Sequence, residues 1–269
     1  MQPLSKSLKQ VVPYLSAYDQ PDVPEGALDP LGLYSISDAI TVNFLCPGIR
    51  ERQKHPGFLV TLAIGASVTE NFSESYLNEK VLTPIQVFEW YVVHALVKTY
   101  GKSNPKRLAG LPGKDKVATA LGQSESVAEG NYLKTPSVFG FYGVYKLLAR
   151  DLEVMSDDNM GPECARLIKA WEHDVSNEIG DVRAYYDLVR EAVSYGLSNH
   201  KTQKNWNHWE RFARPLVTND PGERASAVLW ELLTDPNVQL RSEYFQFIVN
   251  QGAKIVSSDS EINEKALHA

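Results

Sequence analysis

Apolar residues recur at helical spacing along most of this chain, and two segments show the pattern most clearly. Residues 57–72 are apolar on nearly every side, which is typical of a helix buried at the centre of a protein. Thr83, Pro84 and Gln86 have the spacing of a capping box, and the helix that they open presents apolar residues every three or four positions as far as Tyr100. We therefore predict a buried central helix followed by a second, capped helix.

The second half of the chain continues with helical periodicity. The helices that this periodicity predicts span residues 160–175, 181–195, 202–213, 223–233 and 238–251. Residues 13–33 differ, because four prolines and two glycines are too many helix breakers for regular structure, and we predict a loop that wraps over a neighbouring part. The predicted fold class is mainly α, with many helices.

Residues 131–150 combine a helix start, two glycines, four clustered aromatic residues and three cations. Thr135 and Pro136 can open a helix, in which Gly140 and Gly143 share one side and leave room for another backbone to approach closely. The aromatic side chains suit either stacking on nucleic-acid bases or packing between helices. Packing is the commoner use of such a cluster.

The run of short helices from residue 112 to about 154 has the proportions of a helix-turn-helix or winged-helix core. In this interpretation residues 135–150 form the presented helix, and residues 151–154 lead into a short strand. A polar stretch near residue 123 suggests two domains, an N-terminal arm and helical region at 1–123 and a C-terminal helical region at 124–269. A single domain is the alternative.

Positive charge is concentrated in a few segments, although the chain as a whole carries a net charge of −6. Residues 98–116 hold six cations against the single acid Asp115, and residues 199–211 combine cations with asparagine, glutamine and two tryptophans, which suits phosphate and base contacts. A plainer account makes Trp206 and Trp209 the anchors of an amphipathic helix. The candidate nucleic-acid-binding residues are Lys102, Lys106, Arg107, Lys114, Lys116, Lys134, Lys146, Arg150, Lys201, Lys204 and Arg211.

The sequence contains neither a complete phosphate-binding loop nor a complete hydrolase elbow. The segment 111–115 lacks the first glycine and the hydroxyl residue of a phosphate-binding loop, and Ser67 lies in an apolar helix without the second glycine of a hydrolase elbow. Glu89 and His94 are five residues apart, which places them on different faces of a helix, unlike the one-turn pairs that bind zinc. We assign no catalytic residue, metal or cofactor, and an enzyme is the less favoured class.

A magnesium-dependent nuclease nevertheless remains an alternative, since Glu70 and Glu74 stand one helical turn apart. Its possible tertiary partners are Asp38, Glu51, Lys54 and Glu89.

The composition indicates in which cellular compartment the protein is expected. Two cysteines, Cys46 and Cys164, cannot build a disulfide framework or a cysteine-based zinc site, which favours a reducing compartment. The first residues lack the apolar core of a secretory signal, and no segment approaches the roughly 20 apolar residues of a membrane span. We expect a soluble cytoplasmic protein without membrane contact.

Four short phrases, taken together, resemble poorly characterised prokaryotic proteins encoded in anti-phage defence islands. The phrases are Cys46–Arg52, Glu89–Val93, Leu111–Lys114 and Tyr132–Phe141. The resemblance covers about residues 38–175 and implies only a biological setting, because it names no characterised family and transfers no site residue. In such a setting, a chain without its own enzyme signature resembles a DNA-sensing or adaptor subunit.

The leading hypothesis is a non-catalytic DNA-associated or adaptor subunit of a multi-protein prokaryotic assembly. Residues 98–116 would contact phosphates, and the helix at 134–150 would contact a groove or a partner. The first alternative is a pure interaction scaffold whose aromatic and proline-rich surfaces, including residues 20–33, bury against other protein subunits. The second is the nuclease.

Overall fold

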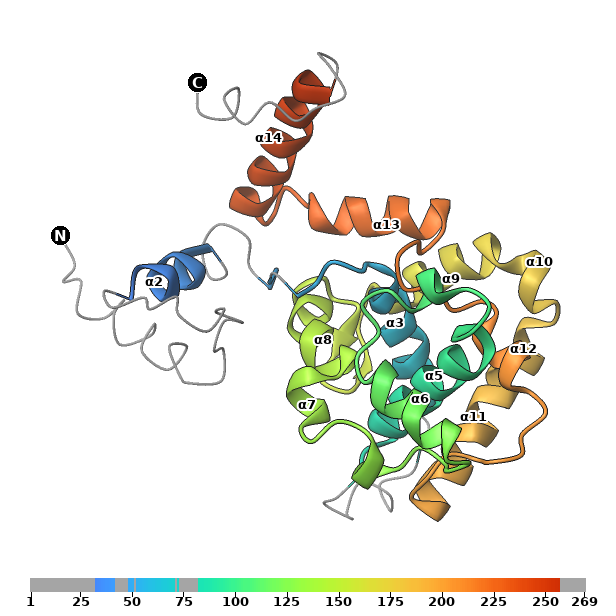
Figure 1. Ribbon diagram of the computed structural model, residues 1–269. Coiled ribbons are helices and arrows are strands. Elements are labelled where there is room, and N and C mark those ends of the chain that lie inside the picture. Colours follow the sequence, from blue (N-terminus) through green and yellow to red (C-terminus); the bar gives the residue numbers. More distant parts are fainter. Residues whose placement is uncertain (1–31, 42–47, 51, 71, 73–81, 257–269) are drawn as a thin grey trace. The chain divides into compact units, whose positions relative to one another are not determined.

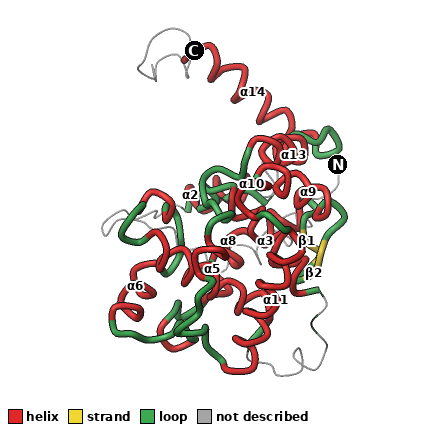
Figure 2. The backbone as a smooth tube through the Cα atoms, turned by 90° about the vertical axis from the view of Figure 1, so that its right-hand side faces the viewer, coloured by secondary structure: helices red, strands yellow, loops and turns green. Residues whose placement is uncertain are grey.

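The protein is described by a computed structural model that covers residues 32–41, 48–50, 52–70, 72 and 82–256 (Figure 1). Most of these residues are helical, which confirms the predicted mainly α fold class. Within the described residues the strands are limited to β1 (Met155–Ser156) and β2 (Asn159–Met160), an antiparallel pair that appears as a short hairpin among the helices (Figure 2). None of the described helices is both long and apolar enough to span a membrane.

The described residues fall into two units, divided between residues 50 and 51 and between residues 232 and 233. One unit contains α2 (Leu33–Ile40) and α14 (Gln239–Val256). The other unit, residues 52–232, contains the buried apolar core. The domain boundary suggested near residue 123 lies inside this second unit, and most of the loop expected at 13–33 lies outside the described residues.

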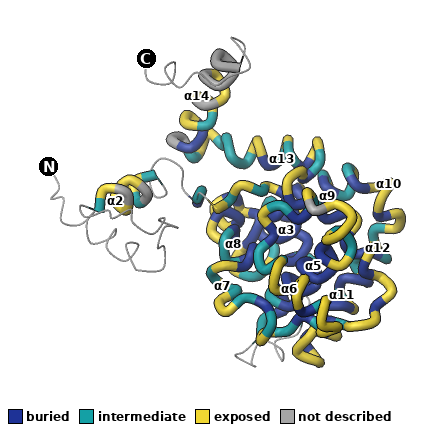
Figure 3. Tube along the Cα trace, viewed as in Figure 1, coloured by how far each residue is buried: buried dark blue, intermediate teal, exposed yellow. Residues whose placement is uncertain are grey.

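Two helices, α3 (Gly57–Thr69) and α5 (Pro84–Tyr100), form the centre of the second unit (Figure 3). Every residue of α3 except the half-buried Ser67 is buried, as its unbroken apolar sequence predicts. Gly65 allows the close approach of α5, because a Cβ atom there would lie 2.7 Å from side-chain atoms of Ile85 and Phe88.

The capping box at the start of α5 is also confirmed. The Thr83 hydroxyl accepts a hydrogen bond from the Gln86 N–H at 3.4 Å, and the Gln86 side-chain oxygen accepts one from the Thr83 N–H at 3.1 Å. Two otherwise unpaired donors at the helix start are satisfied in this way. The sequence therefore fixes where α5 begins.

The remaining helices of the second unit surround these two. In chain order they are η3 (Pro105–Leu108), α6 (Lys114–Gly122), η4 (Glu129–Asn131), α7 (Pro136–Phe139), α8 (Phe141–Asp151), α9 (Cys164–Asp174), α10 (Ser176–Ile179), α11 (Val182–Asn199), α12 (Trp209–Ala213) and α13 (Glu223–Leu233). The apolar stripe of α9 packs on α3, whereas α6, α11 and α12 pack on α5. The predicted helices at 160–175, 181–195, 223–233 and 238–251 correspond to α9, α11, α13 and α14.

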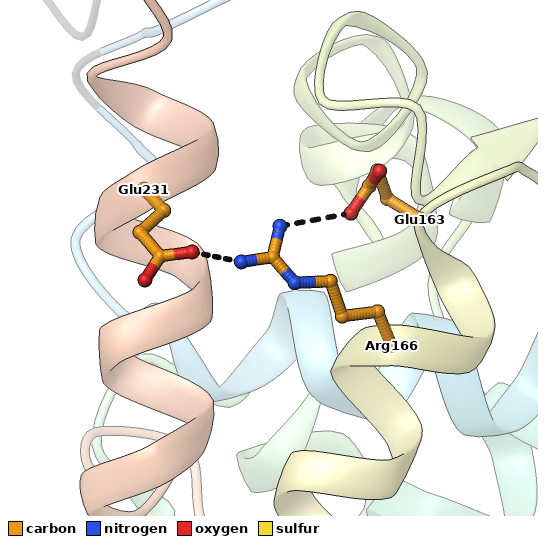
Figure 4. Close-up of polar contacts among 3 residues, drawn as sticks. All are labelled: Glu163, Arg166 and Glu231. Atoms are coloured by element: carbon orange, nitrogen blue, oxygen red, sulfur yellow. Dashed lines mark hydrogen bonds and ion pairs between the residues drawn. The ribbon is translucent and has the colours of Figure 1, made fainter.

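Polar contacts attach α13 to α9. The Asp174 carboxylate, at the end of α9, accepts the backbone N–H groups of Arg224 and Ala225 at 3.2 and 2.9 Å. On the surface, Arg166 forms ion pairs with Glu163 and with Glu231 of α13 (Figure 4). The first turn of α13 is thus capped by a residue from another helix.

The predicted single helix at 135–150 is wrong. The chain forms two helices, α7 and α8, which are separated by Gly140 in an extended conformation, with φ −70° and ψ 160°. The break places the N–H of Tyr142 against the buried carboxylate of Glu89 at 2.9 Å. A Cβ atom at Gly140 would overlap the Glu89 carboxylate and would also lie 2.6 Å from the Pro136 carbonyl oxygen, so both a side chain and a backbone approach this glycine closely.

The aromatic side of α8 faces the core. Phe141 and Tyr145 are buried, and the Phe141 ring stacks on Phe58 of α3 with centroids 5.1 Å apart. These two rings therefore serve helix packing rather than presentation to nucleic acid, whereas Phe139 of α7 is exposed. In this region the chain order is α6, η4, α7, α8 and the β1–β2 hairpin, and the helix-turn-helix or winged-helix interpretation stays a prediction.

The predicted helix at 202–213 is wrong over residues 202–208, and only α12 forms. Thr202 pairs with Val127 instead, donating its N–H to the Val127 carbonyl at 2.8 Å and accepting the Val127 N–H on its hydroxyl at 3.0 Å. Gln203 donates its N–H to the Tyr91 hydroxyl at 3.2 Å. These contacts across the fold replace the hydrogen bonds within a helix.

Candidate functional site

Two basic segments that are about 100 residues apart in the sequence meet at the carboxyl end of α5. The Lys98 ammonium donates a hydrogen bond to the Lys204 carbonyl at 3.3 Å, and Arg107 Nη1 donates one to the Arg214 carbonyl at 3.2 Å. Residues 98–107 hold four cations and no acid, and residues 200–214 hold four cations and one acid. We call the following residues of these segments the basic surface: Lys98, Lys102, Lys106, Arg107, Lys204, Arg211 and Arg214.

Aromatic rings support two of these cations. The Lys98 ammonium lies 5.3 Å from the centre of the Trp209 ring, and the Arg107 guanidinium lies 4.7 Å from the centre of the Tyr100 ring. Arg107 also donates to the Tyr100 hydroxyl at 2.8 Å. Both cations are therefore held in place by the protein rather than extended into solvent.

The two tryptophans predicted as either base-stacking or anchoring residues are anchors. Trp206 and Trp209 are buried, with ring centroids 4.9 Å apart, and Trp209 stacks on His94 at 3.7 Å. Tyr91 lies against both of them. Their rings belong to the core beneath the basic surface. Because both rings are buried, they are not accessible for stacking on bases.

His94 holds the segment 200–208 against α5. Its Nδ1 atom and the Thr202 hydroxyl are hydrogen-bonded at 2.7 Å, and its Nε2 atom is buried with no hydrogen-bond partner among the described residues. Burial, assisted by the charge of Lys98, lowers the pKa of His94 to about 3. The imidazole is thus neutral, and His94 is a hydrogen-bonded residue of the core.

The other predicted cations do not join this surface. Lys146 lies over the Tyr142 ring at 5.7 Å, and Arg150 pairs with Asp157 at 2.9 Å. Both belong to α8, which lies on the opposite side of α3 and α5 from α12 (Figure 1).

Four more of the predicted cations lie near α6 and η4. Lys114 and Lys116 belong to the first turn of α6, and Lys134 follows Leu133, whose side chain lies 3.4 Å from where a Cβ atom of Gly113 would be. Lys201 pairs through its backbone with Ala128. Of the eleven predicted residues, Arg107 and Lys204 take part in the contacts that join the two segments at the end of α5, and Lys102, Lys106 and Arg211 belong to the same two segments.

Sequence reasoning left two members of the basic surface out of the candidate site. Lys98 and Arg214 stand at the ends of the two basic segments, and each takes part in a contact that joins them. Arg214 also pairs with Glu210 at 2.7 Å, a helical neighbour four residues away. Their charge was visible in the sequence, whereas their position depends on the path of residues 200–208.

Glu89 is a buried carboxyl group in the middle of α5. Its two oxygens accept hydrogen bonds from the Tyr132 hydroxyl at 2.7 Å and from the Tyr142 N–H at 2.9 Å. Burial raises the pKa of Glu89 to about 7, although these two hydrogen bonds act in the opposite direction. The residue joins α5, the segment after η4 and the start of α8.

The carboxylates proposed for a magnesium site are not brought together where the structure describes them. Glu70 is exposed at the end of α3, and Glu89 is engaged as above. Glu51, Glu74 and the side chain of Asp38 lie outside the described residues. Within the described part of the chain, no group of three or more histidine, cysteine, aspartate or glutamate residues is arranged to hold a metal ion.

A cavity of about 250 Å³ lies between the first half of α3, the ends of α9 and α10, and residues 215–222. Its walls include Val60 and Ile64, together with Arg107 and several carboxylates.

Comparison with protein-family models, with curated proteins and with solved structures found no match.

Proposed function

We propose that this protein is a DNA-associated subunit of a larger cytoplasmic assembly, and that its basic surface contacts the phosphate backbone. The observation that carries the proposal is the joining of two basic segments by the contacts of Lys98 with Lys204 and of Arg107 with Arg214. Anti-phage defence is the setting that the sequence resemblance suggests. No catalytic step is part of the proposal.

Local charge matters more here than the net charge. The chain carries a net charge of −6, yet residues 98–107 and 200–214 together carry eight lysine and arginine residues against one acid. Cations that neutralise phosphates release the counterions of DNA, which gives binding a steep dependence on salt. A cationic region on an acidic protein also restricts the orientation in which DNA can approach.

The cations of the basic surface have two different roles: some hold the two segments together, and others are exposed to solvent. Lys98 and Arg107 donate hydrogen bonds to backbone carbonyls and hold the two segments together. Lys102, Lys106 and Lys204 are exposed, and their ammonium groups have no protein partner within the described residues. The exposed lysines are therefore the residues that we assign to phosphate contacts.

The test is DNA binding measured by fluorescence anisotropy across a range of salt concentrations. A triple variant with Lys102→Ala, Lys106→Ala and Lys204→Ala removes three exposed charges and leaves the contacts of Lys98 and Arg107 intact. We expect its slope of log K against log salt to be shallower by about 1 for each lysine that contacts a phosphate. Circular dichroism would verify that the fold is unchanged.

A matched control removes three exposed cations elsewhere on the same unit, with Lys169→Ala on α9, Arg183→Ala on α11 and Arg224→Ala on α13. Both triple variants lower the net charge equally, so only a localised interface distinguishes them. Equal losses of affinity in the two variants would point to non-specific attraction and would contradict the proposed surface. Unchanged DNA binding in the first variant would do the same.

A scaffold without nucleic-acid contact is the second candidate, favoured by exposed apolar residues in the other unit. Ile36 and Ile40 are exposed on α2, and Tyr244, Phe247 and Val249 are exposed on α14. A scaffold complex would survive high salt, whereas the DNA complex would not. Running the anisotropy samples with Mg²⁺ on a gel tests the nuclease alternative at the same time, since cleaved DNA would make that alternative primary.

A further inference from the structure

The cavity of about 250 Å³ is lined by none of the three lysines assigned to phosphate contacts, although it shares Arg107 with the basic surface, and its volume suits a ligand smaller than those of typical binding pockets. Val60 and Ile64 of α3 supply an apolar wall, and both residues are buried. Charged residues supply the rest of the chemistry: Arg107 from η3, Asp174 from α9, Glu178 from α10 and Asp220 from the segment before α13.

The positive and negative charges of this cavity are kept apart. Within the described part of the chain, no carboxylate lies within ion-pairing distance of the Arg107 guanidinium. Nη1 of Arg107 is engaged with the Tyr100 hydroxyl and the Arg214 carbonyl, which fixes the group in position. Its Nη2 and Nε atoms make no hydrogen bond to the described residues. They remain available as donors.

The carboxylates differ in what they can still accept. Both oxygens of Asp174 are occupied by the backbone N–H groups at the start of α13. Asp220 uses Oδ1 to accept the Gly222 N–H at 3.0 Å, which leaves Oδ2. The Glu178 side chain is exposed and makes no hydrogen bond with the described residues. Glu178 and Asp220 are therefore the acceptors that a ligand could use.

We propose that this cavity binds a small zwitterion with a short aliphatic body. The ligand's carboxylate pairs with Arg107, its ammonium group pairs with Glu178 and Asp220, and its methylene groups lie against Val60 and Ile64. A ligand with one charge would satisfy one side of the cavity and leave the other unpaired, so both charges are needed for binding. This ligand site goes beyond the proposed function and does not depend on it.

Linear ω-amino acids of increasing length test the proposal, because they vary only the separation of the two charges. The series is glycine, β-alanine, 4-aminobutyrate, 5-aminovalerate and 6-aminohexanoate, with butylamine and butyrate as singly charged controls. Binding to the full chain is measured by saturation-transfer NMR and by the rise in melting temperature. We expect one length of the series to bind best, and both controls to bind at least tenfold more weakly.

Two substitutions locate the site. Glu178→Gln keeps the size of an exposed side chain and removes its charge, and Arg107→Gln removes the cation. Each should weaken the best ω-amino acid at least tenfold, whereas Glu191→Gln, an exposed carboxylate on α11, should have no effect. If Arg107→Gln perturbs the fold, Glu178→Gln still decides the question.

The proposal is overturned if no member of the series binds, if butylamine binds as tightly as the best zwitterion, or if Glu178→Gln leaves binding unchanged. The two proposals fail independently, because the binding of the ω-amino acids is measured without DNA, and the slope of DNA binding against salt is measured without an ω-amino acid. Since the charge of Glu178 also acts on Arg214 of the basic surface, the triple lysine variant rather than Glu178→Gln tests the DNA contact.

Discussion

Two buried titratable residues on α5 respond to burial in opposite ways. Burial raises the pKa of Glu89 to about 7 and lowers the pKa of His94 to about 3. In both cases the low-dielectric surroundings favour the neutral form. The fold therefore carries a protonated carboxyl and a neutral imidazole on one helix at mildly acidic pH.

These two residues make opposite contributions to the pH dependence of stability. Glu89 keeps its proton to higher pH when folded than when unfolded, so its contribution falls as pH rises from about 4.5 to about 7. His94 gains a proton in the unfolded chain below about pH 6.5 but stays neutral in the fold, so its contribution is lost as pH falls below that value. Between pH 4.5 and 6.5 the folded and unfolded states each hold one of these protons, and the two slopes cancel.

Removing one of the two residues should expose the slope of the other. With Glu89→Gln, the free energy of unfolding should fall by about 1.4 kcal/mol for each pH unit between 6.5 and 4.5. With His94→Asn, it should instead rise by a similar amount per unit as the pH falls over the same range. Urea unfolding at several pH values, with the profile of each variant compared with that of the unchanged protein, measures both. Parallel profiles in the three proteins would show that these groups do not titrate as described.

The contact between Gly140 and Glu89 predicts that adding a single methyl group at position 140 lowers the stability of the fold. A Cβ atom at position 140 would overlap the Glu89 carboxylate and lie 2.6 Å from the Pro136 carbonyl. Gly140→Ala should therefore destabilise the fold by about 2 kcal/mol. Gly122→Ala is the control, since beyond its chain neighbours and the backbone of its own helix no described atom lies within 4 Å of the added methyl group, and it should be neutral or slightly stabilising. Thermal unfolding of the two variants gives the comparison.

At the scale of elements, sequence patterns predicted the helices whose positions depend on interactions between residues close together in the sequence. The unbroken apolar run of α3 and the capping box of α5 are local signals, and both helices appear where these signals place them. The break at Gly140 was missed because it depends on Glu89, which is distant in the sequence. Residues 202–208 leave helical structure for the same reason, since their partners are Tyr91, His94 and Val127.

Two kinds of polar contact attach α13 to α9, and they should contribute differently to stability. Asp174→Asn replaces one acceptor oxygen with a donor opposite a backbone N–H, and should cost about 1 to 2 kcal/mol. Arg166→Ala removes the exposed ion pairs with Glu163 and Glu231, which solvent screens, and should cost less than about 1 kcal/mol. Chemical denaturation of the two variants tests this order. A larger loss for Arg166→Ala would contradict it.

At the scale of the whole molecule, the sequence located the positive charge but not its arrangement. Composition alone identified the basic residues 98–116 and 199–211 on an acidic chain. Grouping part of them required the segment 200–208 to lie along α5, which the amino-acid pattern does not encode locally. The cations of α8 were predicted with the same reasoning, and the structure places them on another side of the unit.

The meeting of the two basic segments has a thermodynamic consequence, because the surface exists only while residues 200–214 are docked on α5. Unfolding disperses these cations along the chain, so DNA that binds this surface as proposed would have a higher affinity for the native state. By mass action, DNA at a hundredfold excess over its dissociation constant should stabilise the protein by about 2.7 kcal/mol. The midpoint of thermal unfolding should then rise with DNA concentration, and should rise less in high salt. The melting temperature therefore provides a second measurement of DNA binding.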